Sequence, residues 1–147
     1  MIARFGEVPI SGQSYVRRAG VYAVLPRGSE VLLTYQADPH HEFQLPGGGI
    51  DPGEHPIAAL HREVYEETGW RISTPKRLGT FRRFTFMPEY DLWAEKVCTV
   101  YIARPTFRIG PPPESEHTPY FMPAEMAAEA IYNDGDRYFL KQALGLR

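Results

Sequence analysis

The chain has 147 residues, of which 43% are hydrophobic, so one domain with a single core of ordinary size is expected. Its 16 Lys and Arg residues against 18 Asp and Glu residues give a net charge of −2, which argues against a strongly basic nucleic-acid-binding protein. The single cysteine, Cys98, excludes an intramolecular disulfide. No apolar stretch has the length of a membrane span or resembles a signal peptide core, so we expect a cytoplasmic protein.

The first part of the chain is predicted to contain strands and a glycine loop. Apolar runs predict strands at 20–25 and 31–35 and a short one at 43–45, and residues 1–17 are expected to form an N-terminal extension. Three consecutive glycines at 47–49 are expected to form a loop, because glycine destabilises the interior of a strand or helix.

A helix is predicted from Pro56 to Thr68. Proline suits the first helical turn, where its missing N–H costs no hydrogen bond, and Gly69 supplies the C-terminal stop. Within this range the residues that recur at helical spacing are Ile57, Leu60, Val64 and Thr68.

The second part of the chain continues this mixture of strands and helices. We expect a bulge at Arg82 and Arg83, where the alternation of the strand is broken. Mixed elements in one small domain indicate an α/β (α+β) fold. The expected elements are a strand at 77–86, a loop at 87–96, a buried strand at 97–103, a last strand at 117–122, and helices at 123–131 and 136–144.

Three glutamates share one face of the predicted helix. At about 100° per residue, Glu66 lies about 60° to one side of Glu63, and Glu67 about 40° to the other. Like charges so close together repel each other, and a divalent cation such as Mg²⁺ or Mn²⁺ would relieve the repulsion. An acidic helix face alone is usually only solvated, so the upstream sequence decides between the two interpretations.

The glycine loop and the helix together form a motif from Gly48 to Trp70. Its fixed positions are occupied by Gly48, Glu54, Arg62, Glu63, Glu66, Glu67 and Gly69, and its apolar positions by Val64 and Trp70. In this motif the chain resembles the Nudix (MutT-like) hydrolases, with Trp70 bulkier than the aliphatic residue usual at that position.

The resemblance implies an α/β/α sandwich with a mixed central sheet. It also implies Mg²⁺-dependent hydrolysis, with Mn²⁺ as a second option, of a diphosphate linkage in a nucleoside diphosphate joined to a moiety X. By the same resemblance Glu63, Glu66 and Glu67 bind the metal, and the backbone carbonyl of Gly47 adds a ligand. Gly48, Glu54, Arg62 and Gly69 are structural parts of the motif, and Arg62 is expected to pair with Glu54 and orient the helix.

The general base is left open between a glutamate of the motif and one on a distant loop. Glu114 and Glu116 both occupy such a loop, and Glu116 is preferred because it lies closer to the aromatic pair Tyr120-Phe121. Stacking on a base and contacts to phosphates need aromatic and cationic side chains. The proposed substrate readers of this kind are Arg18, Arg82, Arg83 and Phe86.

The expected partner is a nucleotide-type small molecule, with no membrane and no nucleic acid except a capped RNA end. Homodimers are common in the family, although the sequence shows no interface. Two other functions stay open: a catalytically silent Nudix-fold sensor, which usually lacks motif glutamates, and an isomerase, which needs a reactive cysteine. Cys98 is expected to be buried in a strand, and no metal site is predicted at His40, His41, His55 or His61.

Overall fold

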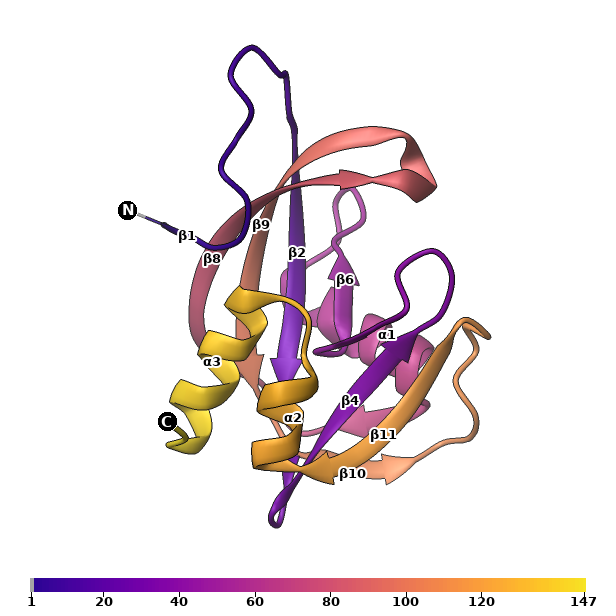
Figure 1. Cartoon of the computed structure of the whole chain (residues 1–147). Coiled ribbons are helices and arrows are strands. Elements are labelled where there is room, and N and C mark those ends of the chain that lie inside the picture. Colours follow the sequence, from indigo (N-terminus) through magenta and orange to yellow (C-terminus); the bar gives the residue numbers. More distant parts are fainter. Residues whose placement is uncertain (1) are drawn as a thin grey trace.

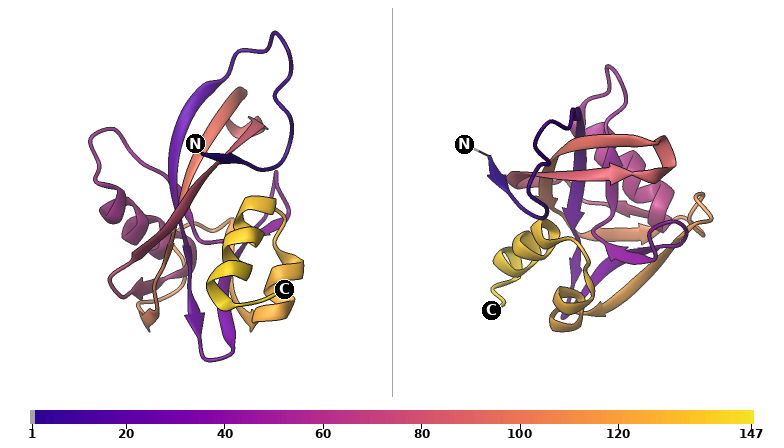
Figure 2. Two further views of the ribbon diagram at one scale, coloured as in Figure 1. Left: turned by 90° about the vertical axis from the view of Figure 1, so that its left-hand side faces the viewer. Right: turned by 45° about the horizontal axis from the view of Figure 1, so that its top comes forward.

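The computed structural model describes residues 2–147; Met1, the first residue of the predicted extension, lies outside the described residues. A mixed central sheet is flanked on one side by helix α1 (Pro56–Thr68) and on the other by α2 (Ala124–Ala130) and α3 (Asp134–Leu144), as Figures 1 and 2 show. The fold class is therefore mixed α/β, as predicted. None of the helices in the described chain is both long and apolar enough to cross a membrane.

The central sheet has five strands. In their order across the sheet these are β1 (Ala3–Arg4), β8 (Lys76–Met87), β9 (Leu92–Ile102), β2 (Val16–Val24) and β6 (Gly47–Gly49). Strand β2 runs parallel to β9, whereas β8 is antiparallel to β9, so the sheet is mixed. The short β1 pairs with β8, so part of the predicted N-terminal extension belongs to this sheet.

Two smaller groups of strands complete the structure. In one, β4 (Glu30–Gln36) lies between β11 (His117–Pro123) and β3 (Pro26–Arg27), and also pairs with β5 (Glu42–Gln44). In the other, β7 (Trp70–Ile72) pairs with β10 (Pro105–Arg108). Strand β11, which begins at His117, contacts α1, so this part of the chain lies beside that helix.

The core lies on both faces of the central sheet. Along β2, Val21 and Ala23 pack in the cluster with α1, while Val24 belongs to the cluster that includes α2 and α3. Successive side chains of a strand point to opposite faces, so a strand covered on both sides needs a continuous apolar run. This explains the runs at 20–25 and 31–35 that predicted β2 and β4.

The prediction for α1 is confirmed at both ends. The side chain of His55 accepts a hydrogen bond from the N–H of Ile57, and Pro56 occupies the first turn. Gly69 ends the helix with φ 78°, and a Cβ at this position would lie 1.9 Å from the carbonyl oxygen of Gly110. Both the left-handed backbone and the close approach therefore require glycine.

The glycine loop expected at 47–49 is instead strand β6, which pairs with β2. Gly47 has φ 152°, and a Cβ there would lie 2.1 Å from the carbonyl oxygen of Val21. Gly47 is therefore required because two backbones approach closely, which is one of the reasons for glycine in a strand.

Two predictions about the hairpin of β8 and β9 were wrong. The bulge lies between Arg77 and Gly79 rather than at Arg82 and Arg83, which stay in regular register with β9. The expected loop at 87–96 is shortened to the 3-10 helix η1 (Pro88–Tyr90), and β9 begins at Leu92. The β8–β9 hairpin is therefore long, and its tip extends beyond the three helices (Figure 1).

Candidate active site

Acidic side chains from α1 and from the loop before β11 converge on one place. Carboxylate oxygens of Glu63, Glu66 and Glu114 lie within 4.8 Å of one another. A second group within the same limit consists of Glu67, Glu114 and His117, so Glu114 belongs to both. We call the five side chains of these two groups the carboxylate cluster.

The backbone holds the loop against the C-terminal end of α1. The N–H of Glu114 donates to the carbonyl oxygen of Glu66 over 3.0 Å. The N–H of Ile109 donates to the carbonyl oxygen of Gly69 over 2.7 Å. Carbonyl groups of the last helical turn have no partner within the helix, so these bonds satisfy them. The same bonds place the side chain of Glu114 beside the helix.

The structure brings Glu114, rather than the preferred Glu116, to the cluster. Glu116 is exposed and belongs to neither group of donors. Its carbonyl oxygen accepts a hydrogen bond from Ala37, which fixes its backbone two residues beyond Glu114. The closer spacing to the aromatic pair was therefore a misleading criterion, because the contact with α1 sets the position of the loop.

Glu67 is buried within the cluster, with 5% of its surface exposed. Its Oε1 accepts a hydrogen bond from the N–H of Gly47 over 3.1 Å. Burial raises the pKa of Glu67 well above its ordinary value, the bond from Gly47 opposes this, and the neighbouring carboxylates of Glu63 and Glu114 raise it further. The predicted ligand role of the Gly47 carbonyl stays a prediction.

Two further carboxylates of the cluster, those of Glu63 and Glu114, also have raised pKa values. Burial raises the pKa of Glu63 to about 7, although Arg62 acts in the opposite direction. Burial also raises the pKa of Glu114, with Glu66 and Glu116 adding to the effect. Carboxylates this close together repel one another when they are ionised, and a bound cation would relieve that repulsion. Their oxygen atoms are hard donors, the kind that Mg²⁺ and Mn²⁺ prefer.

Arg62 has the predicted contact with Glu54. Its Nε and Nη2 donate to the two oxygens of that carboxylate, each over 2.8 Å, and this hydrogen bonding lowers the pKa of Glu54 to about 2. The opposite side of the guanidinium donates from Nη1 to Glu66 over 2.6 Å and to Glu63 over 2.9 Å. A bonded network of this kind orients the side chains that would bind a metal.

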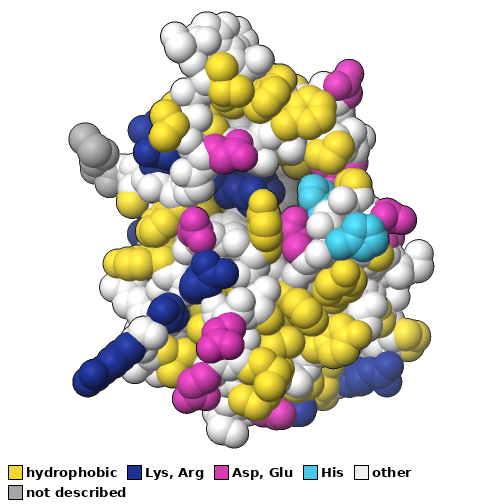
Figure 3. All heavy atoms as spheres, in the orientation of Figure 1, with side chains coloured by type: hydrophobic (Ala, Val, Ile, Leu, Met, Phe, Trp, Pro, Cys, Tyr) yellow, Lys and Arg dark blue, Asp and Glu magenta, His cyan; other side chains and the backbone are white. Residues whose placement is uncertain are grey.

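A cleft of about 620 Å³ begins at Glu63 and Glu67 and extends between the β8–β9 hairpin and the loops around β5. Figure 3 shows basic, acidic and histidine side chains around a hollow in this face. Three of the four predicted substrate readers, Arg18, Arg83 and Phe86, line the cleft.

The fourth predicted reader, Arg82, lies away from the cleft. It pairs with Val97 in the register of the sheet, and its Nη1 lies 3.4 Å from Oε2 of Glu95. Because consecutive residues of a strand point to opposite faces, Arg82 and Arg83 cannot both enter one cleft. The structure therefore gives no support to Arg82 as a substrate reader.

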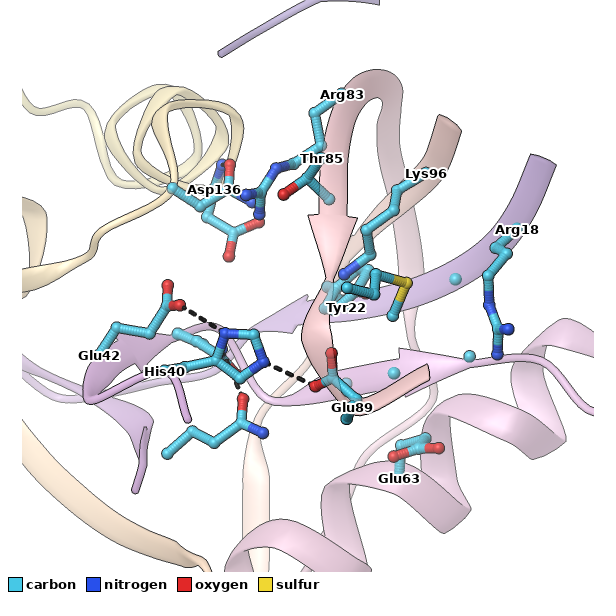
Figure 4. A pocket seen from close by; sticks show the side chains of 18 of the residues that line it. Arg18, Tyr22, His40, Glu42, Glu63, Arg83, Thr85, Glu89, Lys96 and Asp136 are labelled. Carbon is cyan, nitrogen blue, oxygen red and sulfur yellow. Dashed lines mark hydrogen bonds and ion pairs between the residues drawn. The ribbon is translucent and has the colours of Figure 1, made fainter. Parts of the chain in front are cut away.

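At its other end the cleft contains charges of both signs (Figure 4). Arg83 and Lys96 point into it from β8 and β9, and Asp136 faces them from α3. Burial raises the pKa of Asp136 to about 6, against the opposing effect of the two cations. His40 joins two walls of the cleft, since its ring lies 3.3 Å from Glu42 and 2.7 Å from Glu89.

Sequence reasoning missed His117. Its side chain is 4% exposed, and burial lowers its pKa, which favours the neutral ring. The available signal was the alternation of the last strand, where His117 shares a face with Phe121, a residue packed in the cluster with α1. Four other residues that line the cleft were also not predicted as site residues: Tyr22, His40, Lys96 and Asp136.

Cys98 lies buried in β9, as predicted. Burial raises the pKa of its thiol to about 12, so the thiol is protonated at neutral pH. This gives no support to the isomerase alternative, which requires a reactive cysteine.

A family model described as the NUDIX domain matches residues 14–143. The chain therefore belongs to the Nudix family. Among solved structures, a NUDIX hydrolase from Nitrosomonas europaea has a TM-score of 0.67 at 17% identity and covers 89% of this chain and 91% of its own. A MutT protein from Methanosarcina mazei Go1 has a TM-score of 0.67 at 20% identity and covers 89% of this chain and 95% of its own. At these identities the two structures support the fold alone.

Curated relatives are similar over shorter segments. A Bacillus subtilis (strain 168) protein named "Putative 8-oxo-dGTP diphosphatase" is 31% identical over 74 residues, which are 50% of each chain. An RNA pyrophosphohydrolase of Helicobacter pylori (strain ATCC 700392 / 26695) is 48% identical over 44 residues, 30% of this chain and 28% of its own. The chain thus spans half or less of the length of these relatives.

Proposed function

We propose that this chain hydrolyses a diphosphate linkage in a nucleoside diphosphate joined to a moiety X, with Mg²⁺ or Mn²⁺ held by Glu63, Glu66 and Glu67. We also propose that the chain works as one Nudix domain. The observation that carries the proposal is the convergence of these glutamates with Glu114 at one end of a cleft that also presents cations.

The chemistry explains why such a convergence is useful. A diphosphate concentrates negative charge, and its hydrolysis adds a water molecule in line with the leaving oxygen. A bound divalent ion would neutralise part of this charge and make water a better nucleophile. The motif glutamates would hold the ion, and Arg62 would keep two of them, Glu63 and Glu66, in position.

A proton must also leave the attacking water. A carboxylate with a raised pKa is a better proton acceptor; burial raises the pKa of Glu63 to about 7 and raises the pKa of Glu114 above its ordinary value. We propose that Glu114, rather than Glu116, is the loop glutamate that serves the reaction. Arg18 and Arg83 line the cleft and would contact the anionic or aromatic parts of the substrate.

The names of the relatives and the size of the cleft suggest which substrates to test first. A volume of about 620 Å³ lies within the usual range for a site that takes one nucleotide-sized ligand. One relative is named for 8-oxo-dGTP and another for RNA. We therefore propose a nucleoside triphosphate or the 5′ end of an RNA as the first candidates for the substrate.

A release assay with purified protein tests the proposal. The panel would contain normal and oxidised nucleoside triphosphates, ADP-ribose, sugar nucleotides, dinucleoside polyphosphates, and triphosphorylated or capped RNA, each with Mg²⁺ and with a chelator. The proposal predicts turnover of at least one compound, abolished by the chelator. Binding of a nucleotide to folded protein without turnover of any panel member would favour the catalytically silent sensor instead.

A further inference from the structure

His117 lies at the inner edge of the carboxylate cluster. Its Nε2 is 3.5 Å from Oε2 of Glu67 and 3.5 Å from Oε2 of Glu114. The side chains of His117 and Glu67 are 4% and 7% exposed, so this corner of the cluster is more enclosed than the one formed by Glu63 and Glu66. A buried nitrogen atom thus faces two carboxylate oxygens.

The two distances suit donors that share an ion better than donors that bond to each other. A good hydrogen bond from nitrogen to oxygen is about 2.7–3.2 Å long. Two donors that each lie about 2.1 Å from one ion are separated by about 3.0 Å at a right angle and by about 3.4 Å at a tetrahedral angle. The spacing of Nε2 from Glu67 and Glu114 lies close to the second value.

The other ring nitrogen of His117 is fixed by a second contact. Its Nδ1 is hydrogen-bonded to Oγ1 of Thr34 over 3.0 Å, and Thr34 is fully buried in β4. Histidines that bind metals use the second nitrogen in this way, which sets the orientation of the ring and leaves the first nitrogen free for the ion. The strand pairing of β4 and β11 holds both residues in place.

We propose that His117, Glu67 and Glu114 form an inner metal position with mixed nitrogen and oxygen donors, which takes a transition ion such as Mn²⁺ or Co²⁺ in preference to Mg²⁺. Imidazole binds transition ions, whereas Mg²⁺ prefers oxygen donors alone. The outer position, formed by Glu63, Glu66 and Glu114, has only oxygen donors and suits Mg²⁺. This inference rests on the proposed function, because both metal positions belong to the cluster proposed to carry out the hydrolysis.

Pulsed electron paramagnetic resonance of Mn²⁺ added to the metal-free protein tests the inner position directly. We expect a ¹⁴N coupling from imidazole in the wild type, its loss in His117→Gln, and its retention in His61→Gln, a matched change on α1 outside the cleft. In calorimetric titrations, His117→Gln should weaken Mn²⁺ binding by about tenfold or more and Mg²⁺ binding much less. Absence of the coupling in the wild type, or an equal loss for both ions, would overturn the proposal.

Two further measurements keep the test decisive. Circular dichroism of the metal-free His117→Gln variant shows whether it folds. If it does not fold, the test rests on the ¹⁴N coupling of the wild type and on the variant Thr34→Val. Thr34→Val should weaken Mn²⁺ binding while leaving the imidazole nitrogen in place. Turnover with Mg²⁺ but no ¹⁴N coupling would overturn this inference and leave the proposed function standing. A ¹⁴N coupling without turnover of any substrate would support the inner metal position and contradict the proposed hydrolysis.

Discussion

Gly48 lies so close to Glu63 that a Cβ on the glycine would be 2.5 Å from the carboxylate oxygen Oε2. Strand β6 therefore runs directly along the acidic face of α1. The neighbouring glycine, Gly49, has open space where its Cβ would be. This contact explains why the first position of the motif is glycine: a larger side chain at Gly48 would collide with Glu63. The explanation does not depend on the backbone freedom of glycine.

Gly48→Ala should therefore displace the carboxylate of Glu63 and lower kcat/KM by about tenfold or more, the scale expected when a metal ligand loses its position. The far end of a glutamate can move, so we expect little change in the midpoint of thermal unfolding. Gly49→Ala is the matched control and should leave kcat/KM unchanged. Equal activity of the two variants would show that Gly48 does not position Glu63.

Glu114→Gln and Glu116→Gln form a second matched pair. The loop places only Glu114 in the cluster, so Glu114→Gln should lower kcat by about 100-fold or more, whereas Glu116→Gln should retain nearly full activity. Steady-state kinetics at saturating metal would measure both. A larger loss in Glu116→Gln would mean that the loop moves when substrate binds.

The two adjacent arginines of β8 should behave differently. Arg83 lines the cleft and Arg82 points to the opposite face of the sheet. Arg83→Ala should therefore raise KM by about tenfold, since a charge-assisted contact contributes about 1.5 kcal/mol, with a smaller effect on kcat. Arg82→Ala should leave KM unchanged, and a raised KM there would contradict the assignment of the two faces.

Asp136 should make the stability of the protein depend on pH. Its pKa is raised from 3.8 to about 6 in the folded state, chiefly by burial, so the folded protein binds more protons than the unfolded chain between these pH values. Asp136 therefore reduces stability as the pH rises through this window, by up to about 3 kcal/mol at pH 7.

Asp136→Asn removes this effect. Relative to the wild type, the variant should gain free energy of unfolding between pH 4 and pH 7, which urea denaturation at each pH would measure. Asp134→Asn, in the same helical turn but with an exposed carboxylate, is the matched control. If both variants respond to pH in the same way, the burial of Asp136 does not control this dependence.

The helix and its acids could be predicted because their signals are local. Pro56, Gly69 and the spacing of Leu60 and Val64 lie within one short segment, and the fixed residues of the motif lie there too. The pairing of Arg62 with Glu54 spans only eight residues and came from the family resemblance.

The remaining features depend on contacts between distant segments. Gly47 is in a strand because β2 lies beside it, and neither glycine content nor alternation reveals such a partner. The choice of Glu114 over Glu116 depends on a backbone bond to α1, and the role of His117 depends on Thr34, 83 residues away. Strand alternation predicts that Arg82 and Arg83 face opposite sides of β8, but only the structure shows that Arg83 is the one that lines the cleft.

Glu67→Gln tests the central claim most directly, because it keeps the size of the side chain and the acceptor for the N–H of Gly47 while removing the charge. The measurement is kcat/KM with Mg²⁺ on the best substrate of the panel, beside Glu129→Gln, the same change at an exposed position of α2. We expect a folded Glu67→Gln protein whose kcat/KM is lower by about 100-fold or more, and a Glu129→Gln protein with wild-type activity. Wild-type activity in Glu67→Gln would contradict a metal site built on this helix.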